Sequence, residues 1–143
     1  MAAKRKTARE KLHNDRQPEL ADLGGNMLKR YGPGKMLIPT PVQVDLLIRG
    51  IPAGEVRTAG SLRDELGSRA GAVTTCPLCF GIFWRLAAEA SEEGRADGLK
   101  PAPYWRVVKE DGKLNEKLPG GIEGHAELLR SEGHTVERGR VIG

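Results

Sequence analysis

Cys76 and Cys79 are candidates for thiol redox chemistry. Their two-residue spacing is that of dithiol redox motifs, and Pro77 directly after Cys76 indicates that the pair begins a helix. Since a helix N-terminus lowers the pKa of a thiol, Cys76 would be the attacking thiol and Cys79 the resolving one. The alternative is that both are reduced packing residues, the common role of free cysteine.

Other cysteine chemistry is disfavoured by the surrounding sequence. A thioredoxin-like fold needs a βαβ frame, and no strand pattern immediately precedes Cys76. A structural zinc site would need ligands from His13, His125 and His134, and the last two lie outside the usual histidine spacing. Two cysteines this close together also cannot staple a secreted fold. We therefore expect no metal, no cofactor and reduced thiols, and a thiol-redox or metal-binding protein that uses Cys76 and Cys79 is the alternative function.

Thr58 and Ser61 are candidates for a different chemistry, the binding of phosphate. They stand at the start of a short predicted helix, where hydroxyls and free backbone N–H groups meet the positive end of the helix dipole. The alternative is an ordinary capped helix, because capping is the usual role of these residue types. Ser61 and Asp64 have the look of a capping box.

The elements that must position these residues are mainly helices. Thr40 and Pro41 predict the start of a core helix that ends at Gly50, and a shorter helix follows over 61–67. A longer helix is predicted over 77–93, with Phe80, Phe83, Trp84, Leu86 and Ala87 as its core-forming positions. Two helices joined by a short glycine-bearing turn outline a helix-turn-helix.

The last part of the chain combines strand and helix patterns. Residues 105–108 predict a strand, and residues 110–113 supply hairpin turn chemistry, which together would form a small wing. A final helix is predicted from Ile122 to a glycine cap at Gly133, followed by a terminal strand within 135–142. The sequence therefore predicts a small, mostly helical α/β domain.

The positive charge of the chain is concentrated near its start. Residues 1–40 hold nine basic and four acidic residues, a balance of +5, whereas residues 41–143 hold 14 basic and 15 acidic residues, a balance of −1. A basic, flexible arm adds affinity for nucleic acid by releasing counterions, although a merely solvated extension has the same composition. We expect residues 1–35 to be a basic, largely disordered arm, with order beginning near Met27, and 36–143 to be the domain.

Length and hydropathy limit the class of protein. A chain of 143 residues that is 38% apolar can form one domain with a single core. No run approaches the roughly 18 apolar residues needed to cross a bilayer, and no signal-peptide pattern follows the basic start. We expect a soluble, cytoplasmic monomer without a membrane partner.

The order of several short motifs resembles that of a known family. These motifs are Ile51-Pro52-x-Gly54-x-Val56-Arg57, Pro103-Tyr104-Trp105-Arg106-Val107-Val108, Asp111-Gly112-x-Leu114, Gly120-Gly121 and Leu128-Leu129-x-x-Glu132-Gly133. Over roughly residues 40–134 the chain resembles the DNA-binding domain of the 6-O-alkylguanine-DNA alkyltransferases and their alkyltransferase-like relatives. The resemblance implies a winged-helix domain of the helix-turn-helix type.

The resemblance also implies that the catalytic step is missing. Tyr104 and Trp105 stand where the family's Pro-Cys-His-Arg signature has its alkyl-accepting cysteine and its histidine, and neither can act as a thiolate nucleophile. We therefore expect no enzyme activity but non-catalytic binding of duplex DNA, with alkylated guanine sensed for a repair partner. Tyr104 would stack on an extruded base, and Arg106 would support the site. The alternative is that both aromatic residues close the core.

Some positions depart from the family pattern. Ala59 stands where the family has a tyrosine that rotates the target phosphate, and Leu78 where it has an arginine finger, for which Arg69 or Arg85 would have to substitute. Acidic residues over 89–93 would repel phosphate, which favours a protein-interaction module that has lost DNA binding as a further alternative. The candidate DNA-binding residues are Thr58, Ser61, Arg69, Arg85, Pro103, Tyr104, Trp105 and Arg106.

Overall fold

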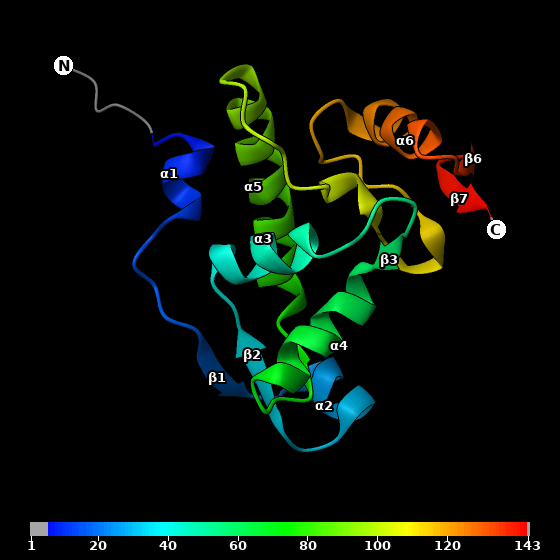
Figure 1. The fold of residues 1–143 in the computed structure, drawn as a ribbon. Coiled ribbons are helices and arrows are strands. Elements are labelled where there is room, and N and C mark those ends of the chain that lie inside the picture. Colours follow the sequence, from blue (N-terminus) through cyan, green and yellow to red (C-terminus); the bar gives the residue numbers. More distant parts are fainter. Residues whose placement is uncertain (1–5, 143) are drawn as a thin grey trace.

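The computed structural model describes residues 6–142, which form a small α/β domain built around one long helix. This helix, α5 (Pro77–Ala96), runs through the middle of the molecule (Figure 1). Helices α3 (Pro41–Arg49) and α4 (Ala59–Arg69) lie against it. In the same view α1 (Ala8–Leu12) lies on one side of α5, and α6 (Gly121–Ser131) lies on the other.

The strands are short and form three separate sheets. Strand β2 (Lys35–Ile38) pairs antiparallel with β1 (Glu19–Asp22) and parallel with β4 (Thr74–Thr75), and α2 (Gly25–Tyr31) connects β1 to β2. Strand β3 (Arg57–Thr58) pairs parallel with β5 (Val107–Val108). Strands β6 (Thr135–Glu137) and β7 (Arg140–Ile142) form an antiparallel hairpin at the C-terminal end.

Two clusters of buried side chains hold these elements together. The larger joins α3 to α5 and includes Val44 and Ile48 from α3 and Phe80 and Trp84 from α5, each at most 3% exposed. The smaller joins α6 to the β6–β7 hairpin and includes Ala126, Leu129 and Val136. Among residues 6–142, no helix is both long enough and apolar enough to cross a membrane.

The predicted helix starts are largely confirmed. Thr40 caps α3, Pro41 is its first residue, and Gln43 completes a capping box with Thr40. The second helix begins earlier than predicted, at Ala59, because Thr58 rather than Ser61 is its N-cap. It also continues through Gly67, where a Cβ would lie 2.5 Å from backbone atoms of Thr74. Glycine at this position allows the turn into α5 to cross close to α4.

The wing predicted over 105–113 does not form. Tyr104–Arg106 and Glu110–Gly112 form short 3₁₀ helices, and Val107 and Val108 pair in parallel with β3 instead of turning back on themselves. The hairpin lies at 135–142, where the sequence indicated only a terminal strand. Its turn is made by Arg138 and Gly139, which both have a positive φ.

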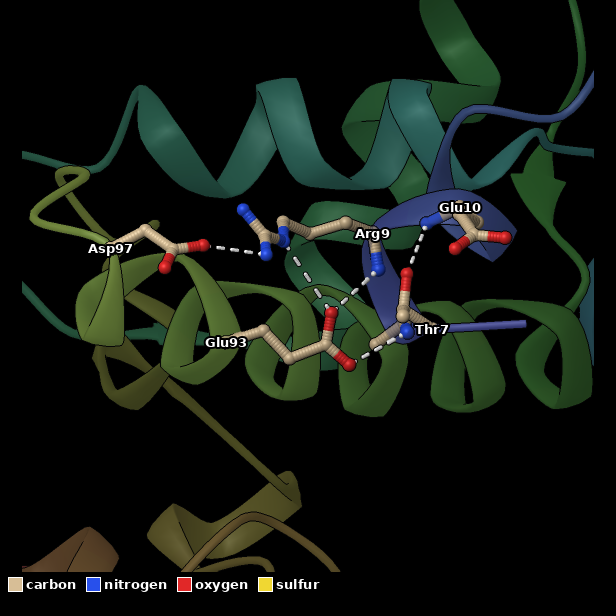
Figure 2. A network of polar contacts seen from close by, with 6 residues as sticks. Thr7, Arg9, Glu10, Glu93 and Asp97 are labelled. Atoms are coloured by element: carbon tan, nitrogen blue, oxygen red, sulfur yellow. Dashed lines mark hydrogen bonds and ion pairs between the residues drawn. The ribbon is translucent and has the colours of Figure 1, made fainter. Parts of the chain in front are cut away.

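The expectation of a largely disordered arm is also wrong for the part of it that the structure describes. Residues 8–12 form α1, which packs on α5 with Ala8 and Leu12 only 6% and 4% exposed. Figure 2 shows that the Glu93 carboxylate of α5 accepts hydrogen bonds from the first N–H groups of α1. These contacts join residues 84 and 85 positions apart, so local composition does not reveal them. Residues 1–5 of the predicted arm lie outside the described part.

Candidate nucleic-acid interface

Tyr104 occupies the centre of the domain. Its side chain is 2% exposed, its hydroxyl donates to Oε2 of Glu92 at 2.8 Å, and its carbonyl accepts from Nε1 of Trp84 at 3.0 Å. Burial, followed by the Glu92 carboxylate, raises the pKa of the hydroxyl. A ring in this position cannot stack on an extruded base, so that expectation is corrected. Tyr104 is a core aromatic, as the alternative interpretation had it.

Trp105 and Pro103 continue this packing toward a separate surface. Trp105 meets Tyr104 edge to face, with ring centroids 5.3 Å apart, and Pro103 is buried. Both residues line a hollow of about 470 Å³, together with Arg49, Gly50, Ile51, Pro52, Ala53, Lys100, Pro101 and Arg106. None of these residues lines the hollows around the first half of α5 that are described below.

Arg106 connects two parts of the domain through its guanidinium group. Its Nη2 lies 2.6 Å from Oε2 of Glu132, its Nε contacts both carboxylate oxygens, and its Nη1 donates to the Ile51 carbonyl at 2.7 Å. Both side chains are only 15% exposed. The Arg106 guanidinium lowers the pKa of Glu132 by hydrogen bonding to it. These contacts join the end of α6 to the loop after α3.

Thr58 and Ser61 serve as cap residues in this structure. Thr58 Oγ1 accepts from the Ser61 N–H at 3.2 Å, and the Ser61 hydroxyl donates to the Thr58 carbonyl at 2.9 Å. The Gly60 N–H at the same helix end donates to Oε1 of Glu110 at 3.0 Å. Groups of the protein itself therefore occupy the place predicted for a phosphate.

The two cysteines lie side by side at the start of α5. Cys76 is the N-cap residue, and both thiols are free and half-buried. Burial, followed by the neighbouring Cys76, raises the pKa of Cys79 to about 11. A thiol with this pKa is protonated at neutral pH, so Cys79 is not an attacking thiolate, and the attacking role was predicted for Cys76 instead. Within residues 6–142, no group of three or more His, Cys, Asp and Glu side chains could hold a metal ion.

The acidic residues of α5 are held by contacts within the domain. Glu89 pairs with Arg85 at 2.8 Å, and Glu92 accepts from Tyr104. Glu93 accepts from the backbone of Ala8 at 2.8 Å. All three lie in the second half of the helix. The predicted repulsion of phosphate by the 89–93 segment therefore does not apply to the first half.

A cationic hollow with an apolar floor lies beside the first half of α5, and we call it the central hollow. Its volume is about 330 Å³, and it lies between α5, the start of α4 and residues 109–117. Leu78 and Ile82 are 73% and 54% exposed there, and Phe80 and Trp84 lie beneath them. Among the described residues that line it, the charged ones are all cations: Arg63, Arg85, Lys109 and Lys117.

A second hollow adjoins the first along α5. It has a volume of about 560 Å³ and shares Ile82 and Arg85 with the first, so the two form one continuous surface. The ordered N-terminal segment contributes three cations, Lys6, Lys11 and Arg16. Glu89, the acidic residue among its described lining, is paired with Arg85. We call the surface of these two hollows the α5 face.

Comparisons with known proteins find no relative of this chain. No protein-family model matches it, and neither a curated protein nor a solved structure is significantly similar to it. The family resemblance stays a prediction.

Of the three arginines among the candidate DNA-binding residues, Arg69, Arg85 and Arg106, only Arg85 lies on the α5 face. Arg69 pairs with Glu65 at 3.3 Å and lines a separate hollow that also contains Glu55. Six other cations of the face were not predicted individually, because they come from three separate segments that only the fold brings together. They are Lys6, Lys11, Arg16, Arg63, Lys109 and Lys117.

Proposed function

We propose that this protein binds duplex DNA without catalysis, through the α5 face. The observation that carries the proposal is the central hollow, where four cations surround exposed apolar side chains and no carboxylate is among the described lining residues. Glu89, which pairs with Arg85, lines the adjoining hollow instead. Arginine and lysine side chains supply most of the affinity for the phosphate backbone, and a nearby carboxylate would oppose it. This arrangement suits a polyanion better than a small neutral ligand.

The shape of the region supports a helix-turn-helix mode of binding. The major groove of B-DNA admits an α-helix, and the second helix of such a motif lies in it. The first half of α5 has the exposed side chains for this role: Arg85 can donate to guanine, and Leu78 and Ile82 can contact thymine methyl groups. Lys11 and Arg16 on one side and Lys109 and Lys117 on the other would then meet phosphates.

Recognition of alkylated guanine is the finer part of the proposal, and it derives from the family resemblance. Because Tyr104 is buried, an extruded base would have to enter the central hollow, which is lined by Phe80 and Trp84. Neither Cys76 nor Cys79 is among the residues that line this hollow, so no thiol is placed to accept an alkyl group there. A bound lesion would stay unmodified and would need a repair partner.

The test is a binding titration with two duplexes that differ only in one 6-O-methylguanine. Binding is measured by fluorescence anisotropy at a series of salt concentrations. We expect affinity to fall steeply with salt, and Arg85→Ala and Lys117→Ala each to reduce the salt slope by about 1. Arg69→Ala is the matched control and should leave the slope unchanged, since Arg69, which like Arg85 pairs with a glutamate, lies off the face. Equal binding of both duplexes would remove lesion recognition alone. Absence of binding at low salt would overturn the proposal.

A further inference from the structure

The cationic surface continues beyond the α5 face to the C-terminal hairpin. A third hollow, of about 650 Å³, lies between residues 109–116, Ile122 and the β6–β7 hairpin. It shares Lys109 with the central hollow, so the surfaces are contiguous. In the view of Figure 1 the hairpin lies on the opposite side of α5 from α1. The cations therefore extend along both sides of this helix.

The charges at the hairpin differ from most arginines of the domain in having no acidic partner. Lys113, Arg138 and Arg140 are exposed, and no ion pair within residues 6–142 includes them or Lys109. Seven arginines elsewhere each lie within 4.0 Å of a carboxylate: Arg9, Arg49, Arg57, Arg69, Arg85, Arg95 and Arg106. Glu116 and Glu137 line the third hollow but pair with none of its cations.

The hairpin is held firmly enough to present these charges in fixed positions. Val136 is 6% exposed and packs with the α6 residues Ala126 and Leu129. On the other side the Leu114 N–H donates to the Gly139 carbonyl at 2.9 Å, and Lys113 forms a β-bridge with Arg140. The hairpin is thereby fixed both to α6 and to the segment that lines the central hollow.

The turn of the hairpin places an arginine where the backbone disfavours one. Arg138 and Gly139 have φ of 52° and 70°, the left-handed region that two-residue hairpin turns of this kind require at both positions. Asparagine, aspartate or glycine is preferred there, and other side chains raise the energy by roughly 1–2 kcal/mol. Arg138 is thus a strained, exposed cation at the tip, and strained positions cluster at functional sites.

We propose that the β6–β7 hairpin is a second DNA-contacting element, which binds the phosphate backbone beside the α5 face through Arg138, Arg140 and Lys113. This inference rests on the proposed function. With α5 in a major groove, the contiguous surface leads along residues 109–117 to the hairpin, whose unpaired cations then lie beside the adjacent backbone. The hairpin adds affinity and orientation, because phosphate contacts carry no sequence information directly.

The test compares the full chain with the double variant Arg138→Asn, Arg140→Gln. Asparagine suits the left-handed turn position, so the variant removes two charges without destabilising the hairpin. The matched control is Lys35→Gln, Arg69→Gln, which removes two exposed cations that are paired with Asp22 and Glu65 and line none of the three hollows. Both variants change the net charge equally.

We expect the hairpin variant to lower the salt slope by about 1.8, or about 0.9 for each lost phosphate contact. The loss of affinity between 50 and 200 mM salt would then be about 12-fold smaller than for the unaltered protein, by the same relation. The control should keep the original slope. An equal effect of both variants would mean that only net charge matters, and it would overturn the inference.

A second experiment measures where the hairpin lies on the DNA and complements the salt slope. An iron chelate is attached to the variant Arg138→Cys in a Cys76→Ser, Cys79→Ser background. It should cleave the DNA backbone at sites beside those protected by α5. Cleavage spread evenly over the duplex would overturn the inference.

The variants Arg85→Ala and Lys117→Ala separate the two proposals. If they weaken binding and the hairpin variant does not, the hairpin inference alone fails; if neither weakens it, the proposed function fails as well.

Discussion

Removal of the Tyr104 hydroxyl tests whether this residue packs in the core or contacts a ligand. The hydroxyl donates to Glu92 inside the domain. Tyr104→Phe should lower the free energy of unfolding in urea by about 1.5–3 kcal/mol, because the acceptor is charged. DNA affinity should not change, since Tyr104 is not part of the α5 face.

Tyr31→Phe is the matched control for this substitution. The Tyr31 hydroxyl contacts Asp64 at 3.3 Å in an exposed position, so its removal should change stability by less than that of Tyr104. If Tyr104→Phe instead left stability unchanged and reduced the preference for 6-O-methylguanine, Tyr104 would have to contact the lesion.

The thiols of Cys76 and Cys79 lead to a second prediction at the residue scale. With its pKa raised to about 11, Cys79 is thiolate in only about one molecule in a thousand at pH 8. Alkylation of Cys79 by iodoacetamide, followed by mass spectrometry, should therefore be slow at pH 8 and accelerate as the pH rises toward 11. Rapid alkylation of Cys79 at pH 7 would contradict the raised pKa. The variant Cys76→Ser, Cys79→Ser should bind DNA as the unaltered protein does.

At the scale of elements, α1 depends on a carboxylate from another helix. Glu93 accepts from the N–H groups of Ala8 and Arg9, and Arg9 also pairs with Asp97 at 2.7 Å (Figure 2). A carboxylate at a helix N-terminus is favourable because it satisfies free N–H groups and opposes the helix dipole. A helix of five residues has little stability of its own, so this contact and the burial of Leu12 hold it in place.

Glu93→Gln should therefore detach α1 from α5 at neutral pH. Hydrogen bonds from Ala8 and then Arg9 lower the pKa of Glu93, so the carboxylate stabilises docking above the ordinary carboxyl pKa, and this contribution is lost as the pH falls through the lowered value. Hydrogen exchange at the Leu12 amide should be faster in the variant at pH 7, and the salt slope for DNA should fall because Lys11 leaves the α5 face.

Glu10→Gln serves as the control for this effect, since Glu10 is an exposed residue in the first turn of α1 itself. It removes the same charge without touching the contact with α5, and exchange at Leu12 should stay slow. Equal exchange in both variants would show that Glu93 does not hold α1.

Local signals in the sequence predicted some elements well and others not at all. Thr40 and Pro41 identified the start of α3 because a cap is a property of neighbouring residues. The order of α1 and the burial of Tyr104 could not be read in this way, since they depend on Glu93 and Glu92, more than ten residues away in each case. The α5 face escaped prediction for the same reason, because its cations converge only in the folded chain.

At the scale of the whole molecule, the fold gathers charge that the sequence spreads widely. The N-terminal segment, α4, α5, residues 109–117 and the C-terminal hairpin all contribute cations to contiguous hollows. Many of the remaining arginines pair with carboxylates, which neutralises the rest of the surface. The modest net charge of +4 therefore understates the local field at the proposed interface.

The same contiguous surface requires that the two core clusters keep their relative position, and the Arg106–Glu132 pair is one of the contacts between them. Arg106 holds Ile51 of the larger cluster through a backbone carbonyl, and it holds Glu132 at the end of α6, which belongs to the smaller one. Glu132→Gln leaves the largely buried guanidinium without its charged partner. The free energy of unfolding in urea at pH 7 should fall by about 3 kcal/mol.

The pH dependence of this loss distinguishes the ion pair from simple packing. Arg106 lowers the pKa of Glu132, so the pair stabilises the fold above the ordinary carboxyl pKa, and its contribution is lost as the pH falls through the lowered value. The difference between Glu132→Gln and the unaltered protein should therefore be largest at neutral pH and shrink in acid. Glu127→Gln, an exposed change on the same helix, should cost less than about 0.5 kcal/mol. A difference that stayed constant down to pH 3 would mean that Glu132 acts by shape alone.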